Sequence, residues 1–139
     1  MPRPLSFRRA QRLVRGADFQ RAFQDGSRAR GSVLLVVARR NEAGTTRLGL
    51  SIGKTVWKSA VRRNQVRRVF REAFRLEQAA LPAGFDLVLI AAAPKLEPAL
   101  AATRAELVQL ARKAARRFDE KAAGAPAPAR PAREPRRRP

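Results

Sequence analysis

The segment KTVWKSAVRRNQVRRVFREAFRL, residues 54–76, fixes how the rest of the chain can be arranged. It contains neither Gly nor Pro, and at about 100° per residue it predicts a helix with two contrasting faces. The apolar face comprises Val66, Val69, Ala73 and Leu76, with Phe70 and Phe74 towards its edge. The opposite face carries Arg63, Asn64, Arg67, Arg68, Arg71 and Arg75. We therefore expect this helix to pack on a core and to expose a row of guanidinium groups.

The one-sided charge of this helix favours binding to a polyanion over a merely solvated surface. Four arginines follow one another at i,i+4 spacing: Arg63, Arg67, Arg71 and Arg75. Like charges at this spacing repel by about 0.2–0.5 kcal/mol per pair. A phosphate backbone would relieve the repulsion, and the planar guanidinium can donate two parallel hydrogen bonds to phosphate. The segment therefore predicts a nucleic-acid-binding face, from which Arg62 is the exception because it projects near the apolar side.

The whole chain carries a large excess of positive charge. Its 139 residues include 31 Lys and Arg against 11 Asp and Glu, which gives a formal net charge of +20. A hydrophobic content of 45% is sufficient for one modest core. The field of such a molecule attracts polyanions with an affinity that falls as salt is added. Nucleic acid is therefore the expected partner.

The residue inventory argues against catalysis by protein side chains. The chain contains no Cys and no His, which excludes disulfides, thiolate zinc sites and the commonest general base. Its acidic residues are scattered singly, apart from Asp119 and Glu120. We predict no catalytic residue and no metal site in the protein. No apolar run approaches the length of a membrane span, and the basic start lacks the apolar core of a secretory signal, so a cytoplasmic protein is expected.

Three strands are predicted around the basic helix, at 33–39, 47–52 and 85–91. These runs are rich in β-branched and apolar residues and are bounded by turn residues. The turn at 41–46 predicts that the first two strands form a hairpin, within which Gly49 could mark a bulge or a close backbone approach. Because the long helix separates the second strand from the third, we predict a split βαβ arrangement. The expected fold class is a small α+β sandwich with the basic helix on a central sheet.

Two further helices are predicted. The first covers 17–25, with Asp18 as its N-cap and Gly26 at its end. Phe19 and Phe23 share one face of it, and two roles stay open: core packing, which the residue type favours, or a stacking platform for unpaired bases. The last helix is expected from Pro98 to about Phe118. Its buried face is predicted to comprise Leu100, Leu107, Leu110, Ala111, Ala114 and Phe118.

The composition divides the chain into three parts. Residues 1–15 form a basic arm with little apolar matter, which we expect to be flexible. Residues 16–121 form the RNA-binding α+β domain. Residues 122–139 consist of Ala, Pro and Arg except for Gly124 and Glu134, and a disordered tail is predicted there.

The order of these elements and the segment LGLSIGKTVWKSAVRRNQVRRVFREAFR, residues 48–75, resemble the protein subunit of bacterial ribonuclease P, which removes the 5′ leader from precursor tRNA. The hallmark of this family is an Arg-Asn-Arg helix with further basic residues, followed by Arg-Glu and an aromatic. It is present here as Arg63, Asn64, Arg67, Arg68, Arg71, Glu72 and Phe74. The resemblance covers residues 8 to about 118 and includes Arg12, Leu13, Asp18, Phe19, Phe23, Gly26, Gly49, Leu50, Ser51 and Lys54.

This resemblance implies an α-β-β-β-α-β-α domain, with one strand more than the pattern predicts. It also implies a left-handed βαβ crossover, against the usual right-handed rule. The basic helix is implied to face the catalytic RNA, while a central cleft between the sheet and the first helix, lined by Phe19 and Phe23, receives the single-stranded leader. The expected RNA-binding residues are Arg12, Lys54, Lys58, Arg62, Arg63, Asn64, Arg67, Arg68, Arg71 and Arg75.

Three positions depart from the family pattern. Gln65 occupies the third position of the Arg-Asn-Arg triplet, where Arg62 would be the compensating charge. Thr55 follows Lys54 where many members carry a second Lys. Lys95 stands in for an Arg that is common after the third strand.

The resemblance also implies a division of labour in which the RNA performs the chemistry. Mg²⁺ ions held by RNA phosphates would activate the attacking water, and the protein itself would bind no cofactor. The protein would position the substrate and reduce repulsion between two polyanions. The expected partners are the catalytic RNA and the 5′ leader of precursor tRNA, with no membrane and no DNA.

Two other classes share the composition of this chain. A structural RNA-binding protein of ribosomal type would have the same size, charge and basic tails. A protein that places the basic helix in the major groove of double-stranded DNA is a third alternative. The spaced motif beginning at Arg63, together with Phe19 and Phe23, is the feature that distinguishes the ribonuclease P protein from a structural protein of ribosomal type.

Overall fold

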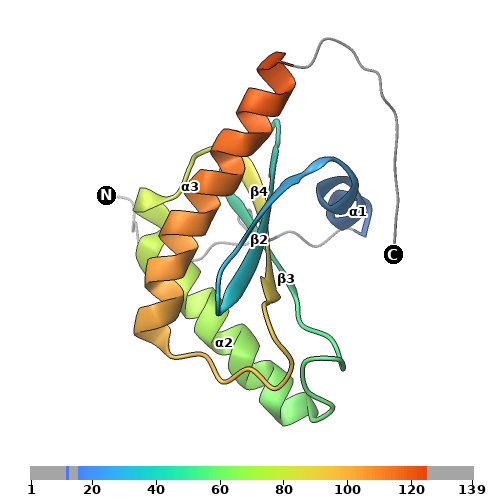
Figure 1. Cartoon of the computed structure of the whole chain (residues 1–139), viewed down its shortest axis with the longest axis vertical. Helices are drawn as coiled ribbons and strands as arrows, with labels where there is room; N and C mark the ends of the chain where they lie inside the picture. The colour runs from blue at the N-terminus through green and yellow to red at the C-terminus, as the bar shows by residue number, and fades with distance from the viewer. Residues whose placement is uncertain (1–11, 13–15, 125–139) are drawn as a thin grey trace.

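The structure is a computed structural model that describes residue 12 and residues 16–124. Its elements, in chain order (Figure 1), are α1 Gly16–Asp25, β1 Ser27–Arg30, β2 Leu34–Arg40, β3 Arg47–Ser51, α2 Ala60–Glu77, the short 3₁₀ helix η2 Gln78–Ala80, β4 Phe85–Ala91 and α3 Leu100–Gly124. The predicted α+β class and the implied α-β-β-β-α-β-α order are confirmed. Two predictions fall largely outside the described residues: the flexible arm at 1–15, of which only residue 12 is described, and the disordered tail at 122–139, of which only 122–124 are described.

The four strands form one mixed sheet in the order β1-β2-β4-β3. Strand β2 pairs antiparallel with β1 and with β4, and β3 pairs parallel with β4. The predicted hairpin between β2 and β3 is therefore wrong. Strand β4 lies between β2 and β3, so both of its edges are paired. Its first five residues are buried, as expected for a strand that is covered on both faces. The handedness of the β3-α2-β4 crossover stays a prediction.

Strand β1 is the strand that the sequence pattern missed. Only one of its four residues, Ala29, is buried, so its hydrophobic signal is too weak to stand out. It forms the antiparallel partner of β2, with Arg30 opposite Leu35. Gly49 lies in regular register opposite Val88, so the predicted strand contains no bulge there.

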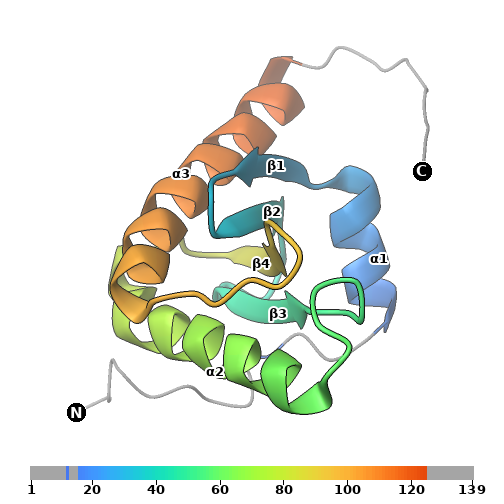
Figure 2. The same ribbon diagram turned by 60° about the horizontal axis from the view of Figure 1, so that its bottom comes forward.

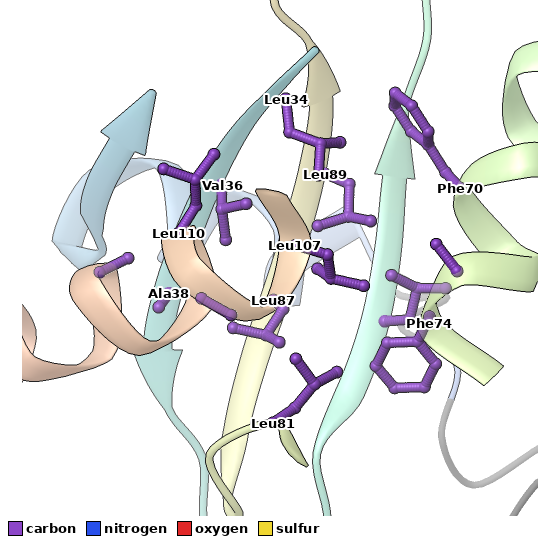
Figure 3. Packing of buried hydrophobic residues seen from close by; sticks show 14 of the residues in the cluster. Leu34, Val36, Ala38, Phe70, Phe74, Leu81, Leu87, Leu89, Leu107 and Leu110 are labelled. Carbon is purple, nitrogen blue, oxygen red and sulfur yellow. The ribbon is translucent and has the colours of Figure 1, made fainter. Parts of the chain in front are cut away.

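Alternation along the strands sends side chains to two layers. The larger core lies between the sheet and the pair α2 and α3, where Leu34 and Val36 of β2 and Leu89 of β4 meet Phe70 and Leu107 (Figure 3). On the other face, α1 packs Ala22 against Val37 and Val88. Figure 2 shows α1 on one side of the sheet and α2 and α3 on the other.

Helix α2 begins later than residue 54, where the basic segment starts. Ser59 is the N-cap, and its hydroxyl oxygen accepts a hydrogen bond of 3.3 Å from the backbone N–H of Arg62. Residues 54–59 therefore form a turn that leads into the helix. The buried residues of α2 are Val66, Phe70, Ala73 and Phe74, whereas Val69 and Leu76 are only partly buried. The core face is thus centred nearer the two phenylalanines than predicted, because the aromatic rings bury the most apolar area.

Asp18 is not the N-cap of α1, as predicted, but lies inside its first turn with a buried carboxylate. That carboxylate is 3.3 Å from Arg21 and 3.9 Å from Arg47, so it is held by charge rather than by the helix end. Gly26 does end the helix, and its N–H donates to the carbonyl of Ala22 over 2.8 Å. A Cβ at this position would lie 2.7 Å from Cγ1 of Val37, so a larger residue would clash.

Helix α3 is longer than predicted at its C-terminal end and starts later. It begins at Leu100, so Pro98 precedes the helix instead of occupying its first turn. It continues past Phe118 to Gly124, which includes residues 122–124 that the composition assigned to the tail. Its predicted core residues Leu107, Leu110, Ala111 and Ala114 are buried, while Leu100 and Phe118 pack partly buried against the core. No helix in the described residues is long and apolar enough to cross a membrane.

Candidate nucleic-acid interface

The side of α2 that faces away from the core carries the predicted arginines. Arg68 and Arg71 are exposed, and Arg63, Arg67 and Arg75 are partly buried. The four buried apolar residues of α2 fix this orientation, because turning the helix would expose two phenylalanine rings to water. The predicted amphipathic division of α2 therefore holds for its charged face.

Two of these arginines brace the turn that precedes the helix. Arg63 donates from one guanidinium nitrogen to the carbonyls of Trp57 and Lys58, both over 3.0 Å. Arg67 donates to the carbonyl of Ile52 over 3.1 Å and to Oδ1 of Asn64 over 2.8 Å. A guanidinium group has five N–H donors, so each arginine keeps donors for an external anion while its position is fixed by the protein.

Arg75 differs, because its charge is paired within the helix. Its guanidinium donates to both carboxylate oxygens of Glu72, over 3.0 and 2.6 Å. The hydrogen bonds from Arg75 lower the pKa of the Glu72 carboxyl, and the same bonds raise the pKa of Arg75. Glu72 therefore stays ionised at neutral pH and offsets the charge of Arg75.

Arg68 and Arg71 are the residues of this face with the greatest freedom to bind a ligand. Neither makes a hydrogen bond or an ion pair with any residue in the described ranges. Their guanidinium groups therefore keep their full set of donors for solvent or for an external phosphate.

Arg62 lies on a different side of α2 from this pair. Its guanidinium is 5.2 Å from the centre of the Trp57 ring and 3.1 Å from a carboxylate oxygen of Glu97. Gln65 lines the same small pocket, of about 170 Å³, together with Val66. Arg62 is thus placed beside Gln65, as a compensating charge would be, but its own charge is paired with Glu97.

Three lysines gather around a second pocket at the ends of β3 and β4. Lys54, Lys58 and Lys95 line a cavity of about 310 Å³ to which no acidic residue in the described part of the chain contributes. The N–H of Lys95 donates to the carbonyl of Val56 over 2.6 Å, and the backbone of Lys95 has a φ of 54°. That left-handed conformation is uncommon for a residue other than Gly, Asn or Asp. The fold thus brings Lys95 to the lysines that precede α2.

Phe19 and Phe23 lie on the opposite face of the sheet. Both are partly buried and pack against the cluster of Ala22, Val37 and Val88. The neighbouring strand residues on that face, Leu35, Ser51 and Ile90, are also only partly buried, so α1 covers this side of the sheet incompletely. Both residues therefore pack against the sheet and stay partly accessible, which is compatible with either role considered for them.

Arg12 is the remaining predicted contact residue. It forms an isolated parallel bridge with Leu48 of β3, and its side chain is exposed. This places Arg12 beside the outer edge of β3.

Trp57 is the site residue that sequence reasoning missed. Its ring N–H donates to the carbonyl of Leu96 over 2.8 Å, which ties the turn before α2 to the loop after β4. The available signal was the single Trp of the chain, placed between Thr55 and Lys58. Among the described residues, no group of three or more acidic side chains is arranged to hold a metal ion.

Comparisons with known proteins agree on one family. The chain matches the family described as Ribonuclease P over residues 7–115. The ribonuclease P protein component of Idiomarina loihiensis is 37% identical over 121 residues, which cover 86% of this chain and 96% of that protein. The ribonuclease P protein component of Photobacterium profundum is 41% identical over 87 residues, which cover 63% of this chain and 73% of that protein.

Solved structures give the same result. The ribonuclease P protein of Thermotoga maritima is 30% identical, with a TM-score of 0.66, and the match covers 73% of this chain and 96% of that one. The ribonuclease P protein of Staphylococcus aureus is 28% identical, also with a TM-score of 0.66, and the match covers 76% of this chain and 96% of that one.

Proposed function

This chain belongs to the ribonuclease P protein family, and on that premise we propose that α2 binds the catalytic RNA while α1 and the adjoining sheet hold the 5′ leader of precursor tRNA. The chain is the protein subunit of an endoribonuclease that matures the 5′ end of tRNA, and its partner is the ribonuclease P RNA. The family match selects this function over a structural protein of ribosomal type.

The observation that carries the proposal is the placement of two different surfaces on opposite sides of one sheet. Helix α2 presents arginines on the side away from the larger core, and α1 presents a pair of phenylalanines on the other face of the sheet. Arginine suits a phosphate backbone, and an aromatic ring suits an unpaired base. One protein can therefore contact a folded RNA and a single strand at the same time.

On the side of the catalytic RNA, Arg68 and Arg71 are proposed as the main phosphate ligands, because no described residue neutralises them. Arg63 and Arg67 would act at the same surface from fixed positions. Lys54, Lys58 and Lys95 would extend it around the neighbouring pocket, with Lys95 in place of the family's arginine. Arg62 and Arg75 are proposed as weaker contributors because Glu97 and Glu72 already pair with them.

On the side of the leader, Phe19 and Phe23 are proposed to stack with unpaired nucleotides. Their partial burial supports this role, since a ring held at one edge by the core loses little conformational entropy when a base stacks on its exposed part. The chemistry itself would belong to the RNA, whose phosphates would hold the Mg²⁺ ions. The protein side chains would bind, orient and screen charge.

The proposal for α2 is tested by reconstituting leader cleavage with the cognate RNA at low magnesium. R68Q/R71Q removes two positive charges from α2, and A102E/A105E provides the matched control by changing net charge equally at exposed positions of α3. The α2 variant should lose affinity for the catalytic RNA, and its salt slope should fall by roughly 1.4–1.8, at about 0.7–0.9 per lost phosphate contact. Equal behaviour of the two variants would mean that α2 is not the RNA-binding face.

A further inference from the structure

The C-terminal half of α3 carries a second basic surface, to which the function proposed above assigns no role. Its members are Arg112, Lys113, Arg116, Arg117 and Lys121, all of them exposed. We name these five residues the α3 basic surface. The family match ends at residue 115, so most of this surface lies beyond it.

The acidic residues of α3 do not neutralise this surface. Glu106 is directed to the loop between β1 and β2, where it accepts hydrogen bonds from Ser32, Val33 and Leu34. Asp119 pairs with Arg40, whose guanidinium donates to both carboxylate oxygens over 2.9 Å. Glu120 alone remains among the five basic residues.

Two members of the surface are held in place by backbone carbonyls. Arg112 donates to the carbonyl of Ala80 over 3.1 Å, and Arg117 donates to the carbonyl of Arg28 over 2.7 Å. Lys113 and Arg116 make no hydrogen bond or ion pair with any residue that the structure describes. Lys113 and Arg116 are therefore available to an external anion, between two arginines whose positions are fixed.

The α3 basic surface lies away from the arginine face of α2. Helix α2 packs beside the first half of α3, and the last turns of α3 continue past it, next to β1 (Figures 1 and 2). An RNA segment bound along α2 therefore does not cover the α3 basic surface by itself.

The chemistry of the surface suits a phosphate backbone better than unpaired bases. The one aromatic residue of α3, Phe118, packs edge-on against Phe85 with ring centres 6.2 Å apart, so it is not offered for stacking. The convex outer side of a helix provides cations and no aromatic platform, which favours contact with the phosphates of a double-stranded segment. The sequence that follows α3 is also positively charged, because residues 125–139 contain five Arg and one Glu.

From this arrangement we propose that the α3 basic surface binds the phosphate backbone of double-helical RNA, as a second RNA contact separate from α2. The proposal extends the function proposed above, because it assigns a second RNA segment to the same protein. Within the enzyme, that segment would be a helical part of the catalytic RNA or of the precursor tRNA, since both present the same phosphates.

The test compares three proteins of equal net charge, K113Q/R116Q, R68Q/R71Q and A102E/A105E, with the unchanged chain. Each is titrated with a 20-base-pair RNA duplex and with an unpaired RNA of the same length, and thermal unfolding verifies folding. K113Q/R116Q should weaken duplex binding at least fivefold relative to A102E/A105E and reduce its salt slope by about 1.8, at about 0.9 per phosphate contact. Binding of the unpaired RNA should change no more than in the control.

Equal loss of duplex binding in K113Q/R116Q and A102E/A105E would overturn the proposal, because only net charge would then matter. An equal loss for duplex and unpaired RNA would overturn it as well. Titration of K113Q/R116Q and its control with the catalytic RNA and with mature tRNA then shows which RNA supplies the double-helical segment. The affinity for that RNA should fall in K113Q/R116Q. Failure of the unchanged protein to support leader cleavage would count against the proposed function and not against this inference, which is measured by duplex binding alone.

Discussion

At the scale of single residues, the arginines of α2 divide into those that the protein uses and those that it leaves for a ligand. Arg67 donates to the carbonyl of Ile52 and braces the turn before the helix. Arg71 is exposed and has no such bond with any described residue. Two arginines four residues apart therefore have different roles, although the sequence pattern treats them as equivalent.

This difference predicts that two equal charge losses affect the stability of the protein differently. Arg71→Ala should cost about 1.5–3 kcal/mol of binding to the catalytic RNA, because a charge-assisted hydrogen bond is lost, and should leave stability unchanged. Arg67→Ala should also lower the free energy of unfolding by about 1 kcal/mol. RNA titration and urea unfolding of both variants check this. Equal stability of the two proteins would show that the bond to Ile52 contributes nothing.

Phe23→Ala tests the leader side. If Phe23 stacks on a base, the variant should lose about 1–3 kcal/mol of affinity for precursor tRNA in the assembled enzyme. Mature tRNA has no leader, so its affinity should not change. Affinity is measured for both RNAs with the same protein preparation, and circular dichroism confirms folding. The same loss with both RNAs would make Phe23 a core residue only.

At the scale of elements, one carboxylate joins α3 to the loop between β1 and β2. Glu106 accepts hydrogen bonds from the backbone N–H groups of Ser32, Val33 and Leu34, over 2.9 to 3.0 Å, and from the Ser32 hydroxyl. Desolvation by itself raises the pKa of the Glu106 carboxyl, but the hydrogen bonds from these three residues outweigh it and lower the pKa overall. The ionised carboxylate therefore stabilises the folded protein.

The sign of this shift predicts how pH affects the contact. A carboxyl whose pKa is lowered on folding adds stability above its unfolded pKa and loses it as the pH falls through the folded pKa. Glu106→Ala should cost roughly 1.5–3 kcal/mol at pH 7, since charged hydrogen bonds are lost. The difference from the unchanged protein should shrink when urea unfolding is repeated near pH 3. A difference that does not depend on pH would show that ionisation of Glu106 is irrelevant.

The helices and strands differ in how well they could be predicted from the sequence. Strand β4 and the body of α2 were predicted closely, because each has a strong apolar period of its own. The predicted pairing of β2 with β3 was wrong because β4 lies between them in the sheet, and β4 is separated from β3 by the 33 residues 52–84. Strand β1 was missed from the pattern because Ala29 is its only buried residue. Local periodicity predicts elements, but it does not predict which distant strand enters between two neighbours.

The candidate site could likewise be predicted only where it depends on local spacing in the sequence. The charged face of α2 could be predicted, since it depends only on spacing along one helix. The pairing of Arg62 with Glu97 and the approach of Lys95 to Lys54 could not be predicted. Arg62 lies in α2 and Lys54 in the turn before it, and each partner lies in a loop more than 30 residues away in the chain. Asp18 was wrongly assigned as an N-cap because the sequence shows only an Asp near the start of a helix. Its pairing with Arg47 is likewise a tertiary contact, which the sequence does not reveal.

At the scale of the whole molecule, the net charge of +20 should govern affinity. If about five phosphates are engaged, log K for the catalytic RNA should fall with a slope on the order of −4 against log salt, at about 0.7–0.9 per phosphate. Titrations from low to moderate salt measure the slope. A slope near zero would reject the electrostatic account, including the roles of Arg68 and Arg71.

The proposed division of labour between protein and RNA is tested by cleavage of precursor tRNA at low magnesium. The protein is purified under denaturing conditions, freed of RNA, refolded and tested alone and with the cognate RNA. With the RNA, the protein should restore removal of the 5′ leader under conditions where the RNA alone is slow, because it supplies binding and charge screening. Alone, it should cleave nothing. Metal-dependent cleavage by the RNA-free protein, or no stimulation of the RNA, would contradict this division of labour.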